Sequence, residues 1–416
     1  MSKKKKILFT HQNFPGQFKH LAPALVDKYE VHSLSLGDNE IEGIQHHKYS
    51  LNGQLNTKNL NRLTIEFESK MIRALSAGDK CLEIKKSGFN PDLIISHPGW
   101  GENLLLKEIW KDTKLINYFE FYYNTKDSDV DFDLKEQERP KHNYDLTTKL
   151  VARNAPLLLA CNQSDLMIAP TNFQKSTAPL EYRDKIKVVH EGVDTEIVKK
   201  TDKESIDIYD DKNSDDKVTL TKNDKVITFV NRNLEPYRGY HIFMRCLPEI
   251  IKKHPDAYIL IIGGNEVSYG ASPKNGSYKD LYFNEIKNKI PENHKIKFLG
   301  RVPYEILLNI FGIPSVHVYL TYPFVLSWSM LEAMSMEALI LGSKTPPVEE
   351  VIINNKNGLL VDFFDHEEMS QKIISILNNP KEYEKIRKEA RKFIVKNYDL
   401  KSICLPKQID LIEGLL

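Results

Sequence analysis

Short apolar runs alternate with longer segments of helical periodicity along most of the first half of the chain. The apolar runs predict buried strands at residues 6–10, 93–95, 115–116, 166–168 and 186–189. Between them, apolar positions recur every three to four residues, most clearly over residues 60–86, and predict helices. This alternation favours a parallel sheet with helices on both faces.

The same alternation restarts in the second half. Strands are predicted at residues 226–230, 258–262, 296–299, 316–320 and 339–341. The stretch 201–224 before them is rich in Asp, Lys and Ser, and it predicts a linker or an exposed hairpin. We therefore expect an α/β protein with two Rossmann-like, doubly wound domains that face a central cleft. The expected ranges are 1–205 and 220–394, with a C-terminal helix at about 395–416 packing back onto the first domain.

Composition excludes several classes of protein. The chain has 416 residues, which favours two domains, and a net charge of +1, which gives no global field for nucleic acid or membrane. No apolar run approaches the roughly 20 residues that span a bilayer. The four cysteines are scattered, show no C-x-x-C pattern, and indicate buried thiols in a reducing compartment. We expect a cytoplasmic protein.

The segment VNRNLEPYRG (230–239) follows a predicted buried strand and carries two arginines. Arg232 and Arg238 stand six residues apart, and Asn231 precedes them at the strand end. Ligands of open α/β sheets bind outside the carboxyl ends of strands, and guanidinium forks suit the oxygens of a diphosphate. A solvated turn with two surface arginines is the alternative.

Loops after three strands of the first half carry further candidates. Gly16 stands at a predicted helix start, where it would let a ligand approach backbone N–H groups, although a plain strand–helix turn explains it equally well. His97 could donate a hydrogen bond to a sugar hydroxyl or act as an acid, whereas a lone histidine is more often structural. Glu120 stands among aromatic residues, where it could anchor a hydroxyl, have a raised pKa, or be the rim carboxylate of an aromatic core segment.

A further candidate segment runs from a strand end into a helix. Backbone N–H groups at Ser327, Trp328 and Ser329 would point at an anion, and Glu332, about one turn into the helix, could accept both hydroxyls of a ribose. A capped core helix with Glu332 in a structural ion pair is the alternative. Gly264 ends the strand predicted at 258–262 and lies at the same sheet edge.

The polar stretch between Phe121 and His142 carries four alternating aspartates, Asp127, Asp129, Asp131 and Asp133. It lacks the glycine and the closing glutamate of an EF-hand calcium loop. We interpret it as an ordinary flexible surface loop, with a moving lid as the lesser alternative.

Five short runs stand in order along the chain: NFPGQF (13–18), HPGWGE (97–102), EFYY (120–123), NLEPYRG (233–239) and YPFVLSWS (322–329). Taken together, these runs resemble the retaining glycosyltransferases of family 4, which have the two-Rossmann GT-B architecture. The resemblance covers nearly the whole chain and is closest to a bacterial subgroup with the same runs in the same order.

The resemblance implies transfer of a hexose from a nucleotide-diphospho-sugar, of UDP or GDP, to an acceptor hydroxyl in bacterial glycan or glycoconjugate synthesis. Arg232 and Arg238 would neutralise the leaving diphosphate, Glu332 would hold the ribose, His97 would lie near the transferred sugar, and Gly16 would lie beside the diphosphate. The resemblance implies retained anomeric configuration, with the leaving phosphate as base. It implies no required cofactor or metal, and an acceptor that is a glycan, a lipid-linked sugar or a protein, with peripheral contact at the inner face of the membrane.

The chain departs from the family pattern at two positions. Eight residues before Glu332, where the family commonly has a second glutamate, stands Phe324, and Glu337 replaces a small glycine. The missing glutamate motivates an alternative, a non-catalytic subunit that binds a sugar nucleotide or a glycan on the same fold. A weaker third reading is a sugar-nucleotide epimerase.

Overall fold

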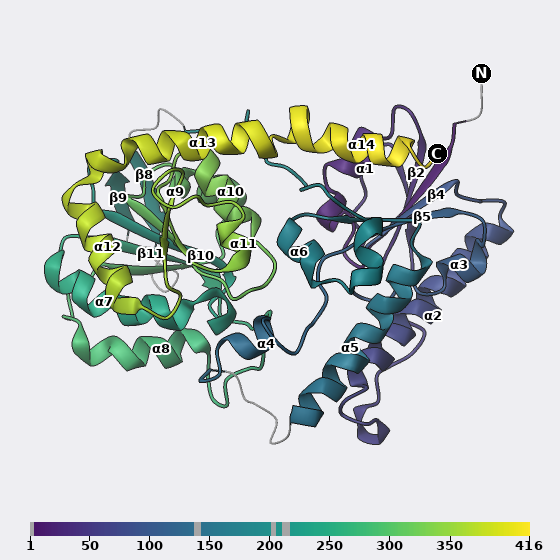
Figure 1. Ribbon diagram of the computed structural model, residues 1–416, viewed down its shortest axis with the longest axis horizontal. Coiled ribbons are helices and arrows are strands. Elements are labelled where there is room, and N and C mark those ends of the chain that lie inside the picture. Colours follow the sequence, from purple (N-terminus) through teal and green to yellow (C-terminus); the bar gives the residue numbers. More distant parts are fainter. Residues whose placement is uncertain (1–3, 137–142, 201–204, 210–216) are drawn as a thin grey trace. The chain divides into compact units, whose positions relative to one another are not determined.

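The computed structural model describes residues 4–136, 143–200, 205–209 and 217–416 of the chain (Figure 1). The chain divides into two compact units. Unit 1 comprises Met1–Lys126, Arg139–Gly192 and Leu400–Leu416, and unit 2 comprises Asp127–Glu138 and Val193–Asp399. A short segment from within the first half of the sequence therefore belongs to unit 2.

Unit 1 is built on a sheet of seven parallel strands. In order of pairing these are β3 (Ile44–Lys48), β2 (Glu30–Ser35), β1 (Lys6–Thr10), β4 (Leu93–Ser96), β5 (Lys114–Tyr118), β6 (Leu166–Ala169) and β7 (Ile186–Val188). Successive residues of β1 enter different clusters, Ile7 and Phe9 on one face and Leu8 on the other. Both faces are buried, which explains why the central strands are continuous apolar runs.

Helices cover both faces of the unit 1 sheet. Residues of α1 (Leu21–Ala24) and α14 (Leu405–Glu413), which contact each other, join the cluster of Ile7 and Phe9. Residues of α2 (Ile65–Lys86) and α3 (Leu106–Ile109) join the cluster of Leu8 on the other face. Helix α5 (Asn143–Gln163) packs along α2, and Figure 1 shows the two side by side. Helix α6 (Asn172–Thr177) follows β6.

Unit 2 repeats the architecture with six parallel strands. In order of pairing these are β12 (Ile296–Gly300), β11 (Tyr258–Gly264), β10 (Val226–Asn233), β13 (Val316–Tyr319), β14 (Ile340–Ser343) and β15 (Leu359–Val361). The helices of this unit are α4 (Asp129–Phe132), α7 (Tyr240–Lys253), α8 (Tyr278–Ile286), α9 (Tyr304–Phe311), α10 (Trp328–Ser335), α11 (Pro346–Glu349), α12 (His366–Asn378) and α13 (Glu384–Tyr398). A π-helical turn, Leu400–Cys404, leads from α13 to α14.

The prediction of two Rossmann-like α/β domains is confirmed, and every predicted strand is present, with ends that differ by at most three residues. The linker or hairpin predicted at residues 201–224 contains the antiparallel strands β8 (Ser205–Tyr209) and β9 (Lys217–Thr221). Residues 201–204 and 210–216 of this stretch lie outside the described residues. Strands β2, β3 and β15 were not predicted.

The interpretation of residues 121–142 as a flexible surface loop is wrong for its described part. Asp129 and Asp133 are buried, and Asp129–Phe132 forms the short helix α4. The reason is long-range: these carboxylates contact side chains that lie more than a hundred residues later in the sequence. Residues 137–142 lie outside the described part of the chain.

Three smaller observations bear on the sequence. The four cysteines are buried and unpaired, as expected. Glu337 has a φ of 61°, a left-handed conformation that a glycine adopts at less cost. Among the described residues, no helix combines the length and apolar character that crossing a membrane requires.

Candidate functional site

Each sheet has a point at which the order of its strands reverses. In unit 1, β1 lies between β2 and β4, and in unit 2, β10 lies between β11 and β13. In open α/β sheets, ligands bind outside the carboxyl ends of the strands at such a switch point. The loops after β1 and β4, and after β10 and β13, are therefore the candidate sites. These loops contain Gly16, His97, Arg238 and Ser327. Asn231 and Arg232 lie at the end of β10 itself, and Trp328, Ser329 and Glu332 lie in α10, which follows the loop after β13. Glu120 follows β5, and Gly264 ends β11.

The end of β10 presents Arg232 to solvent. The pairing of β10 with β11 changes register between Val230 and Asn233, and an irregularity of this kind re-aims the neighbouring side chains. Asn231 is half-buried, whereas Arg232 is exposed and makes no hydrogen bond or ion pair with any residue that the structure describes. Its guanidinium thus keeps its donors for solvent or for a ligand.

Arg238 is placed differently, with only 6% of its surface exposed. Its Nη1 donates to Thr321 Oγ1 at 2.8 Å and to the carbonyl oxygen of Val325 at 2.9 Å. The next residue, Gly239, has a φ of 69°, and a Cβ there would lie 2.4 Å from Leu320. Arg238 therefore joins the loop after β10 to the loop after β13, and the two arginines are not equivalent.

A buried carboxylate that the sequence analysis missed anchors the loop after β10. Glu235 is fully buried, and its Oε2 accepts from the backbone N–H groups of Ser268 at 2.7 Å and Tyr269 at 3.2 Å. Burial raises the pKa of Glu235, although these two N–H donors and the nearby arginines oppose the rise. A lone glutamate beside a proline carries no sequence signal for such a role.

Gly264 and Arg301 both lie beside the side chain of Asn233, the last residue of β10. The amide of Asn233 donates to Ser268 Oγ at 2.7 Å, and its Oδ1 accepts from Arg301 Nη2 at 3.1 Å. A Cβ at Gly264 would lie 2.5 Å from that Oδ1 and 2.9 Å from the Arg301 guanidinium, so a larger residue there would displace one or both side chains. Arg301, which also pairs with Glu266, adds a cation at this edge that the sequence analysis did not single out.

The loop after β13 ends in a capped helix. Ser327 is the N-cap of α10: its Oγ accepts from the N–H of Ser329 at 3.4 Å, and its own N–H donates to Tyr319 Oη at 2.8 Å. Trp328 is half-buried at the first position of the helix. Glu332 is 8% exposed and accepts a 2.7 Å hydrogen bond from the hydroxyl of Tyr304. Burial and the Glu332 carboxylate raise the pKa of Tyr304, so this hydroxyl keeps its proton.

In unit 1, His97 lies in an aromatic cluster and is fully buried. Its ring centroid is 4.6 Å from that of Trp100, 5.1 Å from Tyr118 and 5.3 Å from His11. Burial lowers the pKa of His97 well below its usual value of 6.5, and His11 lowers it further. Nδ1 accepts the N–H of Gly99 at 3.1 Å, and from this contact we assign the proton of the neutral ring to Nε2, which also lies 3.4 Å from the Gln17 amide nitrogen.

Glu120 faces His97 from the end of β5. Its Oε2 lies 3.7 Å from His97 Nε2, and its Oε1 accepts from the Gln17 amide at 3.5 Å. The Glu120 side chain is 42% exposed, whereas the His97 side chain behind it is 1% exposed. This arrangement offers a neutral N–H donor and a carboxylate acceptor side by side, which suits the hydroxyls of a sugar.

Gly16 supports this cluster in a way that the sequence did not reveal. It has a φ of 47°, and a Cβ there would lie 2.3 Å from the ring of His11. His11 Nδ1 accepts the N–H of Asn13 at 2.9 Å, and Nε2 lies 2.7 Å from Gln17 Oε1. Burial lowers the pKa of His11 to about 4, although the Gln17 hydrogen bond opposes the change, so both histidines are neutral near neutral pH.

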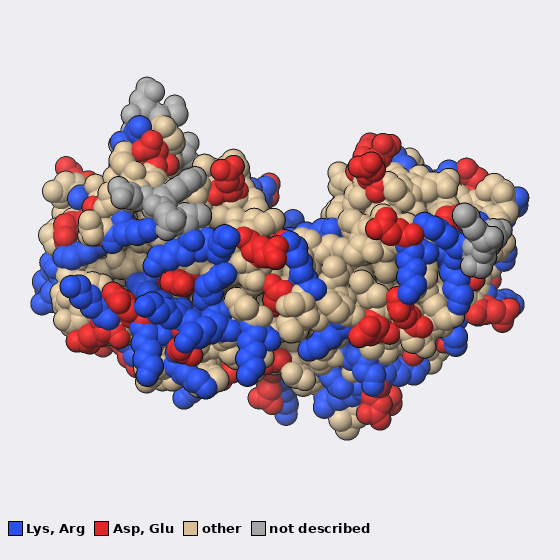
Figure 2. Space-filling view, turned by 90° about the horizontal axis from the view of Figure 1, so that it is seen from above, with Lys and Arg blue, Asp and Glu red and all other residues tan. Residues whose placement is uncertain are grey.

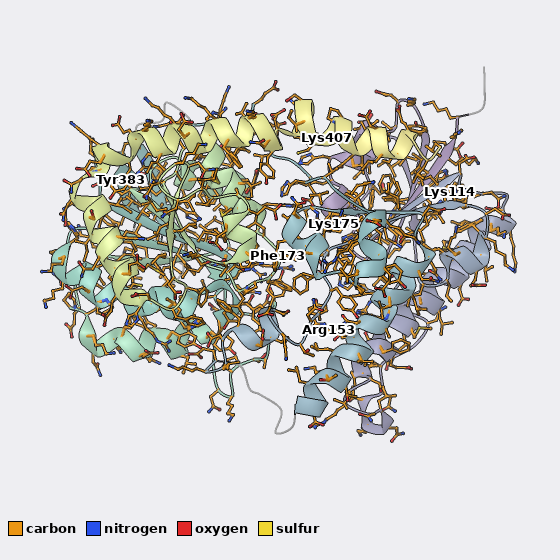
Figure 3. The ribbon with its side chains drawn as sticks, viewed as in Figure 1. Lys114, Arg153, Phe173, Lys175, Tyr383 and Lys407 are labelled. Atoms are coloured by element: carbon orange, nitrogen blue, oxygen red, sulfur yellow. The ribbon has the colours of Figure 1, made fainter. Side chains whose placement is uncertain are left out.

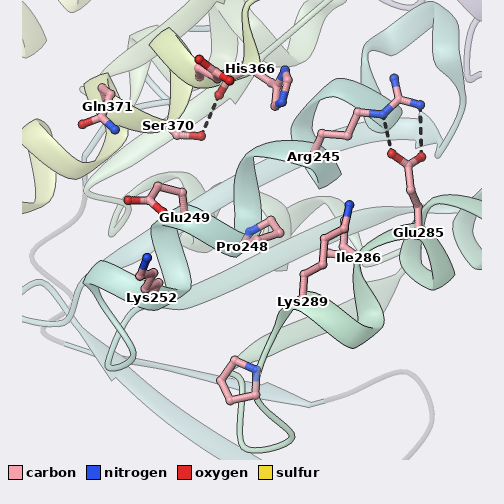
Figure 4. Close-up of a pocket in the computed structure, with 12 residues that line it drawn as sticks. Arg245, Pro248, Glu249, Lys252, Glu285, Ile286, Lys289, His366, Ser370 and Gln371 are labelled. Carbon is pink, nitrogen blue, oxygen red and sulfur yellow. Dashed lines mark hydrogen bonds and ion pairs between the residues drawn. The ribbon is translucent and has the colours of Figure 1, made fainter.

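A pocket of about 860 Å³ lies elsewhere in unit 2, among α7, α8 and α12 (Figure 4). Its lining mixes both charges, and Arg245 and Glu285 pair within it. None of the predicted site residues lines it. The pocket is formed by the later part of α7, away from the carboxyl end of β10 where α7 begins, so it is not the candidate site. Among the residues that the structure describes, none form a group of three or more His, Cys, Asp or Glu that could hold a metal ion.

Two family models match the chain. Residues 28–198 match the glycosyl transferase family 4 group, and residues 210–393 match the glycosyl transferases group 1. Among curated proteins, spore coat protein SA of Bacillus subtilis is 26% identical over 176 residues, which cover 42% of this chain and 45% of that protein. An uncharacterized glycosyltransferase of Methanocaldococcus jannaschii is 23% identical over 312 residues, which cover 74% and 72% of the two chains.

Solved structures share the fold over almost the whole chain. HepE of Anabaena, determined in complex with UDP-glucose, has a TM-score of 0.67 and 14% identity, with 99% of this chain and 100% of that chain covered. Sucrose-phosphate synthase of Thermosynechococcus elongatus has a TM-score of 0.72 and 14% identity, with 99% of both chains covered. At these identities the likeness is one of fold, which is GT-B.

Proposed function

This chain carries the two domains of a GT-B glycosyltransferase, a family 4 group domain followed by a group 1 domain, and on that premise we propose that it is a retaining, metal-independent hexosyltransferase. The donor is a nucleotide-diphospho-sugar, of UDP or GDP, and the acceptor is a hydroxyl of a glycan, a lipid-linked sugar or a protein. The product contributes to bacterial glycan or glycoconjugate synthesis.

The observation that carries the proposal is the set of anion-binding groups at the switch point of unit 2. The guanidinium of Arg232, which pairs with none of the described residues, lies at the end of β10, and the N-terminus of α10 at Ser327–Ser329 follows the adjacent strand β13. A guanidinium fork and backbone N–H groups at a helix start both favour a phosphate. In the proposed complex they neutralise the diphosphate, while Arg238 keeps the two loops together and faces the same charge.

The remaining residues of unit 2 bind the rest of the donor. Glu332 accepts the ribose hydroxyls; its carboxylate already accepts one hydroxyl, from Tyr304, and two carboxylate oxygens can accept several more. Trp328 packs beside the diphosphate at the start of α10. Asn231 and Gly264 line the same edge, where the absence of a side chain at Gly264 leaves the backbone accessible.

The residues of unit 1 act on the transferred sugar and the acceptor. His97 donates from Nε2 to a sugar hydroxyl, Glu120 accepts from another, and Gly16 allows the loop after β1 to approach the diphosphate. In the transfer, the acceptor oxygen bonds to the anomeric carbon as the bond from that carbon to the phosphate oxygen breaks. The acceptor proton passes to the leaving diphosphate on the same face of the sugar, so the configuration is retained and the protein supplies positioning and charge stabilisation.

A second candidate function is a non-catalytic subunit that binds a sugar nucleotide or a glycan. Phe324 stands where the family's second carboxylate is expected, and it is buried against Tyr237 and Tyr269 rather than available to a sugar. An epimerase is the weaker third candidate. Labelled nucleotide sugar separates the three: transfer or slow hydrolysis marks the transferase, binding alone marks the subunit, and a new free sugar-nucleotide isomer marks the epimerase.

The donor can be identified by thermal shift. We expect UDP- or GDP-sugars to raise the melting temperature of the protein with increasing concentration, because a ligand at 100 times its Kd stabilises the folded state by about 2.7 kcal/mol. A UDP-sugar donor is supported by the likeness to HepE, whose structures contain UDP-glucose or UDP with glucose. ADP- and TDP-sugars complete the panel, and Arg232→Ala is the control for binding at the proposed site. A flat response to all four nucleotide classes would contradict the donor assignment.

We also propose that the enzyme works in the cytoplasm and touches the inner face of the membrane. Exposed lysines recur along α13 at helical spacing, at positions 385, 388, 392 and 396. Figure 2 shows Lys and Arg side chains gathered on the face that carries α13. Basic residues near an anionic surface each contribute about 1 kcal/mol to binding.

We therefore expect the protein to sediment with vesicles that contain phosphatidylserine and not with neutral vesicles, and salt should weaken the binding. Changing the four α13 lysines to glutamine should abolish it. Lys252 and Lys253, exposed at the end of α7, provide a control for the same kind of change, with two positive charges removed where the α13 variant loses four. Equal sedimentation of the α13 variant and the control variant would rule out α13 as the contact.

A further inference from the structure

An acidic segment that the proposed function does not use is built into unit 2. It consists of the described residues Asp127–Glu136, which lie within the first half of the sequence but belong to unit 2. Unit 1 holds the chain that precedes the segment: the backbone of Tyr123 exchanges two hydrogen bonds with the Asn154 side chain, and the guanidinium of Arg153 lies 3.7 Å from the Tyr123 ring centroid. Figure 3 labels Arg153, which projects from α5.

Three carboxylates of the acidic segment contact side chains of unit 2. Asp129 Oδ2 accepts from the hydroxyl of Tyr237 at 2.9 Å. Asp133 Oδ2 accepts from the hydroxyl of Tyr322 at 2.9 Å and lies 2.9 Å from His241 Nε2. Glu136 accepts from the hydroxyl of Tyr282 at 2.6 Å and from Arg245 Nη2 at 3.2 Å. Arg245 in turn pairs with Glu285 (Figure 4).

Two of these carboxylates are almost inaccessible to water. Asp129 is 1% exposed and Asp133 is 3% exposed. Burial by itself would raise the pKa of Asp133, but the hydrogen bonds from His241 and Tyr322 outweigh it and hold the pKa below its usual value. A buried carboxylate whose donor is removed loses its compensation, so these contacts are specific and costly to break.

An aromatic side chain fixes the segment between the carboxylates. The ring centroid of Phe132 lies 5.2 Å from that of Tyr322, 5.1 Å from Phe363 and 5.0 Å from Phe364. Aromatic pairs at these distances add to the free energy of burial. The segment is therefore anchored by both apolar and charged contacts.

Two partners of the carboxylates in the acidic segment, Tyr237 and Tyr322, belong to the two loops of the candidate donor site, whereas the other partners of those carboxylates lie in α7 and α8. Tyr237 immediately precedes Arg238 in the loop after β10, and Tyr322 follows Thr321, which binds Arg238, in the loop after β13. The two tyrosines also meet directly: the Tyr322 N–H donates to the Tyr237 carbonyl at 3.0 Å, and their ring centroids lie 4.7 Å apart. Asp129 and Asp133 thus bind the hydroxyls of Tyr237 and Tyr322. These two tyrosines lie in the same two loops as the proposed donor-binding residues.

From these contacts we propose that Asp129 and Asp133 are positioning residues of the donor site, and that the acidic segment holds the loops after β10 and β13 in the geometry that binds the nucleotide diphosphate. This inference rests on the proposed function for the identity of the ligand. The geometric part, that the segment orders the two loops, does not depend on any ligand.

The test compares three variants of the full chain. Asp133→Asn keeps the shape of the side chain and removes its charge, and Tyr322→Phe removes only the hydroxyl, so it serves if Asp133→Asn does not fold. Asp127→Asn is the matched control: it makes the same change in the same segment, Asp127 is exposed, and asparagine tolerates its φ of 51°.

Two readouts separate positioning from general stability. Amide hydrogen exchange without ligand should rise in residues 236–243 and 320–327 of Asp133→Asn and Tyr322→Phe, and not in the Asp127→Asn control. The KM for the nucleotide sugar should rise about tenfold in the first two variants, with kcat changed less than about threefold, as expected when a buried charged hydrogen bond that orders a binding loop is lost.

Unchanged exchange in both loops would overturn the inference, and so would an equal rise throughout unit 2. A wild-type protein that binds no nucleotide sugar would remove the proposed function, and the exchange result would still decide whether the segment orders the loops. Wild-type binding with an unchanged KM in both variants would keep the function and overturn the positioning role.

Discussion

Replacing Arg232 with alanine is expected to lower kcat/KM for sugar transfer by about a thousandfold, the scale of loss when a preorganised donor to a developing charge is removed. The leaving nucleotide diphosphate gains negative charge as the bond to the sugar breaks, and an unpaired guanidinium at the end of β10 stabilises that charge. The melting temperature should stay close to that of the wild type, because Arg232 is exposed and binds no residue that the structure describes. The measurement is steady-state transfer with the donor that the thermal-shift panel identifies.

Two controls sharpen the Arg232 experiment. Arg232→Lys keeps the charge but loses the planar fork, so it should recover part of the lost rate and not all of it. Lys253→Ala removes an exposed cation from the far end of α7 and should leave transfer unchanged. Turnover by Arg232→Ala within a few fold of wild type, or an equal loss in Lys253→Ala, would show that Arg232 does not act on the leaving group.

A variant at Arg238 would be harder to interpret than one at Arg232. Its guanidinium binds Thr321 and the Val325 carbonyl, so a change at Arg238 loosens both loops as well as removing a charge. Loss of activity in an Arg238 variant therefore does not separate structure from chemistry. Arg232 is the cleaner probe because its side chain makes no such hydrogen bond within the described part of the chain.

Much of the fold could be read from the sequence because the central strands are buried on both faces. Runs such as residues 226–230 and 258–262 are apolar at nearly every position, with Thr228 as the polar exception in the first, and each corresponds to a central strand of its sheet. The strands that were missed lie at or next to a sheet edge. Strand β3 contains two histidines, a glutamine and a lysine and is mostly half-buried or exposed, so it has no apolar run to detect.

The site residues fall into two groups: those that a local sequence pattern could identify, and those whose role depends on partners distant in the sequence. A polar residue that directly follows a buried strand lies at the carboxyl edge by geometry, which is why Arg232 and His97 could be placed from the sequence. The role of Asp133 could not be placed, because its partners His241 and Tyr322 are distant in sequence and nothing in four alternating aspartates indicates burial. Glu235 was missed for a similar reason, since its partners are backbone N–H groups of another loop.

The second large effect is expected at His97, where loss of the Nε2 donor should lower kcat about a hundredfold. His97→Phe keeps an aromatic ring in the cluster with Trp100 and Tyr118 and removes both nitrogens, so it tests the donor. His97→Gln places an amide N–H near the position of Nε2 and should recover about a tenth of the wild-type rate or more. If the histidine acted as an acid, both variants would be equally impaired, because an amide cannot release the proton.

The pH dependence follows from the same burial. The pKa of His97 in the folded protein is well below 6.5, so kcat should show no step near pH 6.5 that His97→Gln removes. Stability should respond instead: below pH 6.5 the unfolded chain takes up a proton at this histidine and the folded chain does not, so the folded state loses about 1.4 kcal/mol per pH unit from this group. The contribution of His97 to the free energy of unfolding is complete above pH 6.5 and is lost as the pH falls toward the pKa of His97 in the folded protein.

The variant His97→Gln has no group that titrates here, so it does not show this loss. The free energies of unfolding of the two proteins should therefore converge, or cross in the variant's favour, as the pH is lowered. A stability difference that stays constant from neutral pH down to about pH 5 would mean that His97 already titrates normally in the folded state, and the neutral-donor mechanism would fall with it.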